Sequence, residues 1–307
     1  MNFTKPKFWD LKKPHFLAII LLPVSIVFQF IFWITKSLKR PKKFNVPIIC
    51  IGNIYIGGTG KTPLSREIFN ILNSLNKNPA FIKKSYPYLN DEIKMLENSG
   101  KVFVSENRSS SIYSLIENNY NVAILDDGFQ DFSIESDFSI LCFNSKQLIG
   151  NGLVIPSGPL REKISSIKRA DCIFINGEKN IEFEKKLKKV KSDIEIFYTN
   201  YKIKNSEKLI DKKIIAFAGI GNPSNFFELL IDNNIKVKKT ISFPDHHDYS
   251  EKDFDSITKN EENTNFLTTE KDYFRMNNKM KNKISYVEVD LEIENKEKFI
   301  NLLKKKL

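Results

Sequence analysis

Short apolar runs recur along this chain and separate stretches in which apolar side chains follow a helical period. Buried strands are predicted where the apolar runs lie, at residues 46–51, 121–125, 170–175 and 213–217. A helix is predicted after the first of them, because Leu64, Ile68 and Leu72 share one face at helical spacing. Strands that alternate with helices are typical of an α/β fold with a mostly parallel sheet.

The longest apolar run lies near the N-terminus, at residues 16–34, and only Pro23, Ser25 and Gln29 interrupt it. As a helix it would be roughly 28 Å long, close to the ~30 Å hydrocarbon core of a bilayer. Basic residues flank it on both sides, with a slight excess after it that favours a cytoplasmic C-terminal side. No small-x-small cleavage site follows, which argues against a signal peptide. We expect a membrane-associated helix, either spanning or half-inserted, over the alternative of a buried core helix.

The chain of 307 residues is longer than one hydrophobic core usually organises. We expect three segments. They are an N-terminal membrane-associated helix with basic flanks at residues 1–43, a core at 44–205, and a second, smaller α/β lobe at 206–307.

Charge and cysteine content narrow the class of protein only slightly. The formal net charge of +11 and the pI near 9.3 favour an anionic partner, such as phospholipid, a phosphorylated ligand or nucleic acid. Lysine is abundant along the whole chain, so the charge is equally well explained by biased codon usage. The three cysteines lie in apolar runs without C-x-x-C spacing, which indicates neither a disulfide framework nor a zinc site and suits a reducing compartment.

A glycine-rich loop directly follows the first predicted strand and reads G-N-I-Y-I-G-G-T-G-K-T-P. Its glycines, Gly57, Gly58 and Gly60, let the backbone around Thr59 turn tightly and direct N–H groups at phosphate oxygens. Lys61 supplies a positive charge and the Thr62 hydroxyl can bind Mg²⁺. The strict pattern G-x-x-x-x-G-K-[ST] fails, because Tyr55 stands at its first glycine position. Strand, loop and helix together nevertheless predict that residues 44–205 form a core of the P-loop NTPase type, which binds a nucleotide with Mg²⁺.

Further candidate residues lie in three later segments. Asp126 and Asp127 end the predicted strand 121–125, at the sheet edge where nucleotide metals are bound. Arg161 lies in the Gly- and Pro-rich loop 150–162 and is a candidate phosphate or carboxylate clamp. His246 and His247 are flanked by Asp245 and Asp248. Since adjacent strand residues point to opposite faces, one histidine oriented by a carboxylate is more consistent than a metal site.

Six sequence blocks in a fixed order resemble the tetraacyldisaccharide 4'-kinase (lipid A 4'-kinase) family over about residues 10–290. The blocks are G-N-I-x-I-G-G-T-G-K-T-P, D-D-G-F-Q, G-N-G-x-x-x-P-S-G-P-L-R-E, A-G-I-G-N-P, F-P-D-H-H and T-T-E-K-D. The resemblance implies transfer of the γ-phosphate of ATP to the 4'-hydroxyl of tetraacyldisaccharide 1-phosphate, an anionic lipid A precursor. It implies a monomer at the bacterial inner membrane, with its active site facing the cytoplasm and no nucleic-acid partner.

The resemblance also implies roles for individual residues. Asp91 matches the family's proton-accepting aspartate and His246 its paired histidine, while Glu92 would assist Thr62 and Asp127 at the metal. Catalysis would rest on Asp91, His246, Lys61 and Asp127. Candidate substrate contacts are Asp126, Gln130, Asn151, Arg161 and Arg108, the last of which matches a family position without a derivable role.

The segment that carries Asp91 departs from the family pattern. The family has S-R-G-Y-G and then a longer linker, whereas residues 83–92 compress it, with Lys84 at the arginine position and Asn90 at the glycine before the aspartate. The loop therefore has a different geometry or reach, and Asp91 and Glu92 have the alternative of being solvated acids at a helix start.

Three other functions remain open from the sequence. A membrane-surface ATPase switch of the ParA or MinD kind uses a similar loop. Such proteins, however, have a lysine at the position of Ile56, and their membrane anchor is C-terminal, whereas the apolar run of this chain is N-terminal. Nucleic-acid binding is the second, but the sequence contains no recognisable base-reading module. A kinase of another lipid or sugar acceptor is the third.

Overall fold

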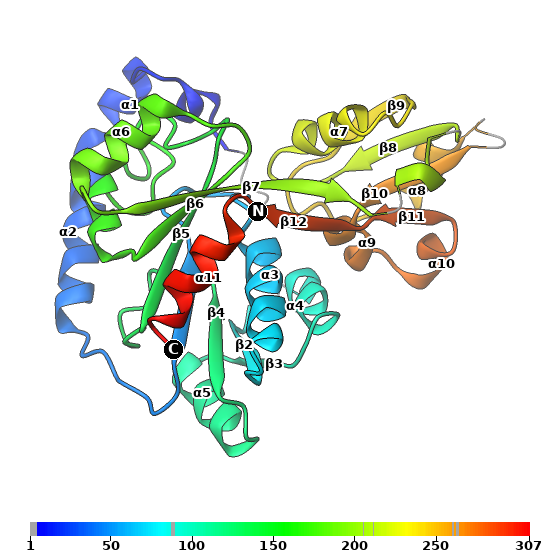
Figure 1. Ribbon diagram of the computed structural model, residues 1–307. Coiled ribbons are helices and arrows are strands. Elements are labelled where there is room, and N and C mark those ends of the chain that lie inside the picture. The colour runs from blue at the N-terminus through cyan, green and yellow to red at the C-terminus, as the bar shows by residue number, and fades with distance from the viewer. Residues whose placement is uncertain (1–4, 87–89, 205, 211, 260, 262–263) are drawn as a thin grey trace. The chain divides into compact units, whose positions relative to one another are not determined.

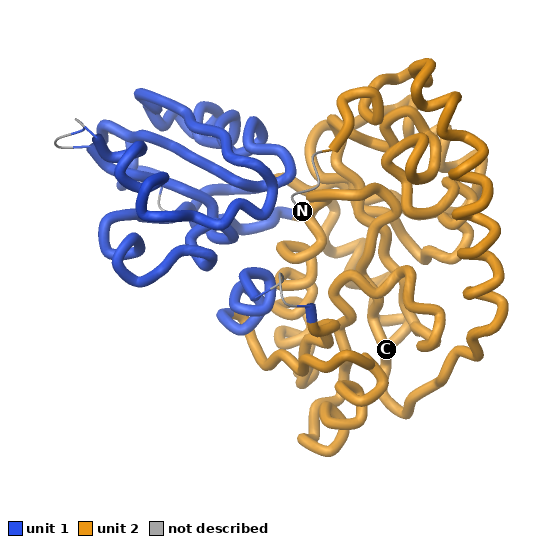
Figure 2. Tube along the Cα trace, turned by 180° about the vertical axis from the view of Figure 1, so that it is seen from behind, with its two compact units in different colours: residues 1–4, 86–98, 201–292 blue, residues 5–85, 99–200, 293–307 orange. Residues whose placement is uncertain are grey.

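The computed structural model describes residues 5–86, 90–204, 206–210, 212–259, 261 and 264–307. Contacts divide the chain into two compact units, coloured separately in Figure 2. Unit 2 comprises residues 5–85, 99–200 and 293–307, and unit 1 comprises residues 86–98 and 201–292 together with residues 1–4. The segment boundaries expected after residues 43 and 205 stay predictions, and residue 205 lies outside the described residues.

The main sheet has eight strands in the order β12-β7-β6-β5-β1-β4-β2-β3 (Figure 1). From β3 to β7 every neighbouring pair is parallel, so the predicted α/β fold with a mostly parallel sheet is confirmed. Strands β7 and β12 carry the chain out of unit 2 and back into it. The bounds are β1 Ile48–Gly52, β2 Pro79–Lys84, β3 Val102–Ser105, β4 Val122–Asp126, β5 Phe138–Asn144, β6 Cys172–Asn176, β7 Glu195–Ile203 and β12 Val289–Ile293.

Buried apolar side chains explain the central position of β1 and β4. All five residues of each strand are buried, as expected for strands covered on both faces. Helix α3 (Lys61–Ser74) packs on β1, β2 and β4, and α5 (Arg108–Glu117) packs on β2 and β3. The remaining helices of unit 2 outside the N-terminal segment are η2 Ile164–Arg169, α6 Ile181–Val190 and α11 Lys296–Lys304.

Pairing of β1 with β4 aligns their carboxyl ends, because Ile51 lies opposite Asp126. The loop after β1 and the turn after β4 therefore begin at the same edge of the sheet. This is the edge at which open α/β sheets bind their ligands.

The N-terminal apolar run forms two helices rather than one. A short 3₁₀ turn, η1 (Lys7–Asp10), precedes α1 (Phe16–Ile20) and α2 (Leu22–Leu38). The break falls at Leu21, just before Pro23 in the first turn of α2, where a proline is tolerated but ends the preceding helix. Across the segments that the structure describes, no helix combines the length and apolar character that crossing a membrane requires.

Helix α2 reverses the usual pattern of a surface helix. Its polar Ser25 is buried and donates a hydrogen bond to the Val154 carbonyl at 2.9 Å. Its apolar side chains are exposed instead, with Ile26 63%, Phe30 59% and Trp33 61% accessible. A soluble surface rarely leaves so many large apolar side chains together, which indicates an interaction surface.

Unit 1 contains a smaller parallel sheet in the order β11-β10-β8-β9. Helix α4 (Asn90–Glu97) lies between β2 and β3 in the sequence, and it packs against α9 (Glu270–Arg275) of this unit. The other bounds are η3 Ser206–Lys208, β8 Ile214–Ala218, α7 Pro223–Asp232, β9 Val237–Ser242, α8 Glu251–Thr258, β10 Asn265–Thr269, α10 Asn278–Lys281 and β11 Ile284–Val287.

Candidate active site

The glycine-rich loop joins β1 to α3, as the sequence predicts, and α3 begins at Lys61. Gly57 and Gly60 have φ of +119° and +87°, in the left-handed region that a side chain would strain. No side chain caps the N-terminus of α3, so its first N–H groups have no side-chain acceptor there. A β-carbon added at Gly58 would meet no atom within 4 Å, so there is open space beside the loop. These features suit binding of phosphate oxygens.

Two buried side chains, Asn53 and Tyr55, hold this loop in place. The Asn53 side chain donates to the Gly57 carbonyl at 3.2 Å and to the Thr59 hydroxyl at 3.0 Å. Tyr55, at the position where the strict pattern has glycine, is fully buried, and its hydroxyl donates to the Asp10 carboxylate and accepts from Lys5. The departure from the strict pattern thus ties the loop to the N-terminal segment.

Asp127 is the charged centre of the unit 2 site. It lies directly after β4 with a φ of +58°, which few non-glycine residues adopt. Lys61 Nζ lies 3.8 Å from its Oδ2, and Arg161 Nη1 donates to both carboxylate oxygens at 3.1 Å. Burial alone would raise the pKa of Asp127, but the charges of Lys61, Arg161 and nearby Lys83 lower it to about 2. The carboxylate is therefore ionised at neutral pH.

Asp126 occupies a different environment from its neighbour. It is fully buried and forms an ion pair with Lys83 Nζ at 2.5 Å. It also accepts hydrogen bonds from the hydroxyls of Thr62 at 3.3 Å and Ser65 at 3.2 Å. Asp126 therefore orients the Thr62 hydroxyl and has no accessible surface for a substrate.

Other candidate substrate residues brace this region of unit 2. Arg108 is buried and donates to the Asp127 carbonyl at 2.8 Å. Gln130 accepts from Arg161 at 3.2 Å and donates to the Asn53 carbonyl at 2.9 Å. The Asn151 side chain lies within its own loop, where it donates to the Ser157 carbonyl at 2.9 Å, and it is not part of the group around Asp127. Their roles as substrate contacts stay predictions.

The donor atoms near the loop suit Mg²⁺. Thr62 and Asp127 offer a hydroxyl and a carboxylate, the hard oxygen ligands that Mg²⁺ prefers, and Mg²⁺ usually takes its remaining ligands from phosphate and water. Among the described residues there is no cluster of three or more His, Cys, Asp or Glu side chains that could enclose a metal ion. An ion at this site would therefore be shared with a bound nucleotide.

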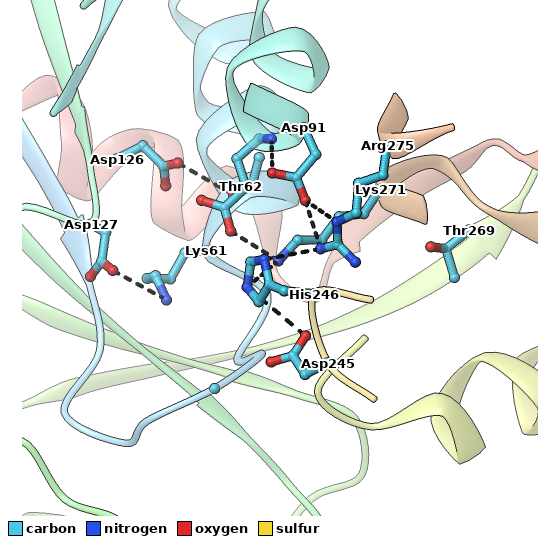
Figure 3. Close-up of polar contacts among 12 residues, drawn as sticks. Lys61, Thr62, Asp91, Asp126, Asp127, Asp245, His246, Thr269, Lys271 and Arg275 are labelled. Atoms are coloured by element: carbon cyan, nitrogen blue, oxygen red, sulfur yellow. Dashed lines mark hydrogen bonds and ion pairs between the residues drawn. The ribbon is translucent and has the colours of Figure 1, made fainter. Parts of the chain in front are cut away.

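A second charged cluster lies in unit 1 (Figure 3). Asp91, in the first turn of α4, is buried, accepts a hydrogen bond from Arg275 Nε at 2.7 Å and forms an ion pair with Nη2 at 2.6 Å. Its neighbour Glu92 accepts from Lys271 Nζ at 3.0 Å. Both acids are therefore paired with cations of α9, and the alternative that they are solvated acids is wrong.

His246 belongs to the same cluster. Its φ of +58° is again unusual, and its N–H donates to the Gly219 carbonyl at 3.1 Å. Arg275 Nη2 lies 3.3 Å from ring Nδ1, and Lys271 Nζ lies 3.4 Å from ring Nε2. Burial and the charge of Lys271, with a smaller contribution from Arg275, lower the pKa of His246 below its usual range. The imidazole is therefore neutral at pH 7.

His247 points to a different partner, as expected for adjacent residues. Its ring Nε2 lies 3.2 Å from Asp253 Oδ2, and the ring stacks on Phe243. The histidine oriented by a carboxylate is thus His247, whereas His246 lies 3.9 Å from the Asp245 carboxylate and faces cations.

Three cations of these clusters were missed in the sequence. Lys83 begins the segment 83–92 and Lys271 lies in the block T-T-E-K-D, but nothing in the local sequence indicates their acidic partners. Arg275 follows Lys271 by one helical turn, so the spacing places both on one face of a helix. That spacing was the available signal. The linker that carries Asp91 includes residues 87–89, which lie outside the described residues.

Comparisons with known proteins agree on one family. The profile of the tetraacyldisaccharide-1-P 4'-kinase family matches residues 17–307. The tetraacyldisaccharide 4'-kinase of Pelagibacter ubique is 43% identical over 99% of this chain and 98% of its own length. That of Rickettsia canadensis is 32% identical, over 98% of this chain and 96% of its own length.

A solved structure supports the same assignment. The crystal structure of LpxK from Aquifex aeolicus in complex with ATP has a TM-score of 0.73 and 27% identity, and it covers 94% of this chain and 99% of that chain. The resemblance seen in the six blocks is confirmed, and this chain belongs to the tetraacyldisaccharide-1-P 4'-kinase family.

Proposed function

We propose that this chain transfers the γ-phosphate of ATP to the 4'-hydroxyl of tetraacyldisaccharide 1-phosphate, in the biosynthesis of lipid A. The observation that carries the proposal is the phosphate-binding loop at the start of α3, with ionised Asp127 beside Lys61, in a member of this family. A membrane-surface ATPase switch is not favoured, because the full-length relatives are named as kinases.

Unit 2 is assigned the nucleotide. The N–H groups of residues 57–60 and the ammonium of Lys61 bind the phosphate oxygens of ATP. Thr62 and Asp127 would hold Mg²⁺, which would neutralise charge on the transferred phosphoryl group. Arg161 keeps the Asp127 carboxylate oriented through its two hydrogen bonds.

Unit 1 is assigned the acceptor chemistry. Asp91 takes the proton of the 4'-hydroxyl while the oxygen of that hydroxyl forms a bond to the γ-phosphorus. The bond from that phosphorus to the bridging oxygen breaks, and ADP leaves with the electron pair. His246, neutral at pH 7, has a ring nitrogen that can accept a hydrogen bond and steady the acceptor. Glu92 stays a proposed assistant at the metal.

The exposed apolar face of α1 and α2 is assigned to the membrane surface on which the acylated acceptor resides. Large apolar side chains are accessible along both helices, whereas Ser25 faces the protein. Partial insertion would remove these side chains from water at about 25 cal/mol per Å² of apolar area. We propose a monomer at the cytoplasmic face of the bacterial inner membrane.

The test is transfer of radiolabelled γ-phosphate from Mg-ATP to tetraacyldisaccharide 1-phosphate in detergent micelles, with Lys61→Ala as the matched inactive enzyme. The proposal requires label in a bis-phosphorylated lipid that is absent with the variant. Consumption of ATP without labelled lipid would instead indicate another acceptor or an ATPase switch. No consumption of ATP by the unmodified protein would contradict the kinase assignment.

A further inference from the structure

Arg275 lies at the last position of α9 and connects the two residues to which the acceptor chemistry is assigned. Its Nε donates to Asp91 Oδ2 at 2.7 Å, and its Nη2 lies 2.6 Å from the same oxygen as an ion pair and 3.3 Å from His246 Nδ1. A single planar guanidinium therefore contacts both side chains, although Asp91 and Arg275 are 184 positions apart in sequence. Figure 3 shows the guanidinium between the carboxylate and the ring.

The guanidinium is itself held in place. Its Nη1 donates to the Gly219 carbonyl at 2.8 Å and to Asp272 Oδ1 at 3.2 Å. Asp272 is fully buried and accepts in turn from the Gly219 amide at 3.0 Å and the Thr269 hydroxyl at 2.7 Å. These contacts come from β8, β10 and α9, so the position of Arg275 is fixed by the smaller sheet of unit 1.

These contacts argue against a direct role for Arg275 in binding the anionic substrate. A guanidinium has five N–H donors, one on Nε and two on each Nη. Nε donates to Asp91, Nη1 donates to the Gly219 carbonyl and to Asp272, and Nη2 lies against both Asp91 and the His246 ring. All three nitrogens therefore already have partners within unit 1.

The contacts on Asp91 leave room for a further donor. A carboxylate accepts about four hydrogen bonds. Asp91 Oδ2 accepts from Arg275 Nε and lies 2.6 Å from Nη2, while Oδ1 accepts from the backbone N–H of Glu92 at 2.8 Å. Both oxygens are thereby fixed in direction and acceptor capacity is left, as required of a base that must meet a hydroxyl in one geometry.

We propose that Arg275 is a positioning residue of the acceptor site, which fixes the Asp91 carboxylate and the His246 imidazole relative to each other through one guanidinium. This inference rests on the proposed kinase function. It predicts that the planar fork is needed as well as its charge, because one ammonium cannot make the same set of hydrogen bonds.

The experiment compares Arg275→Ala and Arg275→Lys with Lys279→Ala, which removes an exposed cation of the same unit. Lipid phosphorylation is measured for kcat and for the KM of ATP. Both Arg275 variants should lose about 10²-fold in kcat, as for a misplacement of about 1 Å. Their KM for ATP should be unchanged because the phosphates bind in unit 2, and millimolar guanidinium should restore part of kcat to Arg275→Ala.

A double-mutant cycle separates positioning from simple stabilisation. In the Asp91→Asn enzyme, Arg275→Ala should cost less than about threefold in kcat, since a positioning residue has little left to position. Full additivity in this cycle, or normal kcat in Arg275→Lys, would overturn the inference. If Arg275→Ala does not fold, Arg275→Lys with the same cycle carries the test. Failure of the unmodified protein to label the lipid would instead contradict the proposed function.

Discussion

Lys61 and Asp127 are the residues whose charges the proposed transfer uses most directly. Lys61→Ala and Asp127→Ala should each lower kcat by at least about 10²-fold, because each removes charge stabilisation of the transition state. Steady-state kinetics of lipid labelling would measure this, with exposed Lys101→Ala as the control that matches the charge change of Lys61→Ala. Retention of more than about a tenth of kcat in Lys61→Ala would contradict its assigned role.

His246 gives a prediction about pH. Its pKa lies below the usual value, so the neutral ring is lost only as pH falls through that lowered pKa. Asp245 favours the protonated ring, so Asp245→Asn should lower the pKa of His246 further and move the acidic fall of kcat/KM to lower pH. NMR titration of the histidine ring protons measures this, with Asp248→Asn as the matched control. A shift to higher pH would contradict the assignment.

Removal of the Asp91 side chain and removal of the His246 side chain should have different effects on lipid phosphorylation. His246→Ala should slow lipid phosphorylation with ATP binding largely preserved, because its partners lie in unit 1. Asp91→Ala should be far slower still, as the proton acceptor is lost. Rapid-quench measurements of a single turnover would separate the two. Full turnover by Asp91→Ala would exclude it as the base.

At the scale of elements, the bond between the Tyr55 hydroxyl and Asp10 joins η1 to the phosphate-binding loop. Tyr55→Phe keeps the buried ring and removes a hydrogen bond to a charged group, so the free energy of unfolding should fall by about 1.5–3 kcal/mol. Denaturation followed by the fluorescence of buried Trp9, in a Trp33→Phe background, measures this change. Equal stability would mean that Asp10 finds another partner.

The elements that local pattern determines were predicted well. The first strand, the glycine-rich loop and α3 follow one another within residues 46–74, and their apolar spacing and glycines specify them without help from distant parts of the chain. Asp127 likewise follows its own strand directly. The break at Leu21 was harder to place, since Pro23 is compatible with the start of a helix as well as with a kink.

The cations of the candidate site could not be predicted in the same way. Lys83 meets Asp126 across neighbouring parallel strands, and Arg275 meets Asp91 only because α4 packs against α9. Such pairs depend on the order of strands and on helix packing, neither of which the local sequence of Lys83 or Arg275 contains. The Tyr55 departure, read in the sequence as a weakness of the motif, is likewise explained only by the distant Asp10.

At the scale of the whole molecule, exposed apolar helices and a net charge of +11 together predict binding to anionic vesicles. Replacing Val27 and Ile31, which are 58% and 55% exposed one turn apart, by Asp should weaken binding at least about tenfold. Vesicle sedimentation measures this. The control is Ile231→Asp, a single change of the same kind at an exposed position of unit 1.

Two outcomes of that measurement separate the contributions. Binding that disappears in high salt while the Val27 and Ile31 variant behaves like the unmodified protein would assign the affinity to charge alone. Unchanged binding by the double variant at both low and high salt would contradict the assignment of α2 to the membrane surface.

The insertion of residues 86–98 into unit 1 from the middle of the unit 2 sequence constrains how this enzyme can evolve. A recombination event exchanges one continuous stretch of gene. An exchange that replaced residues 201–292 alone would remove Arg275 with the old segment, and the incoming segment would supply a foreign partner for Asp91. Unit 1 therefore cannot be exchanged as one continuous segment. A substitution at Asp91 or at Arg275 is expected to be selected together with a matching change at the other residue.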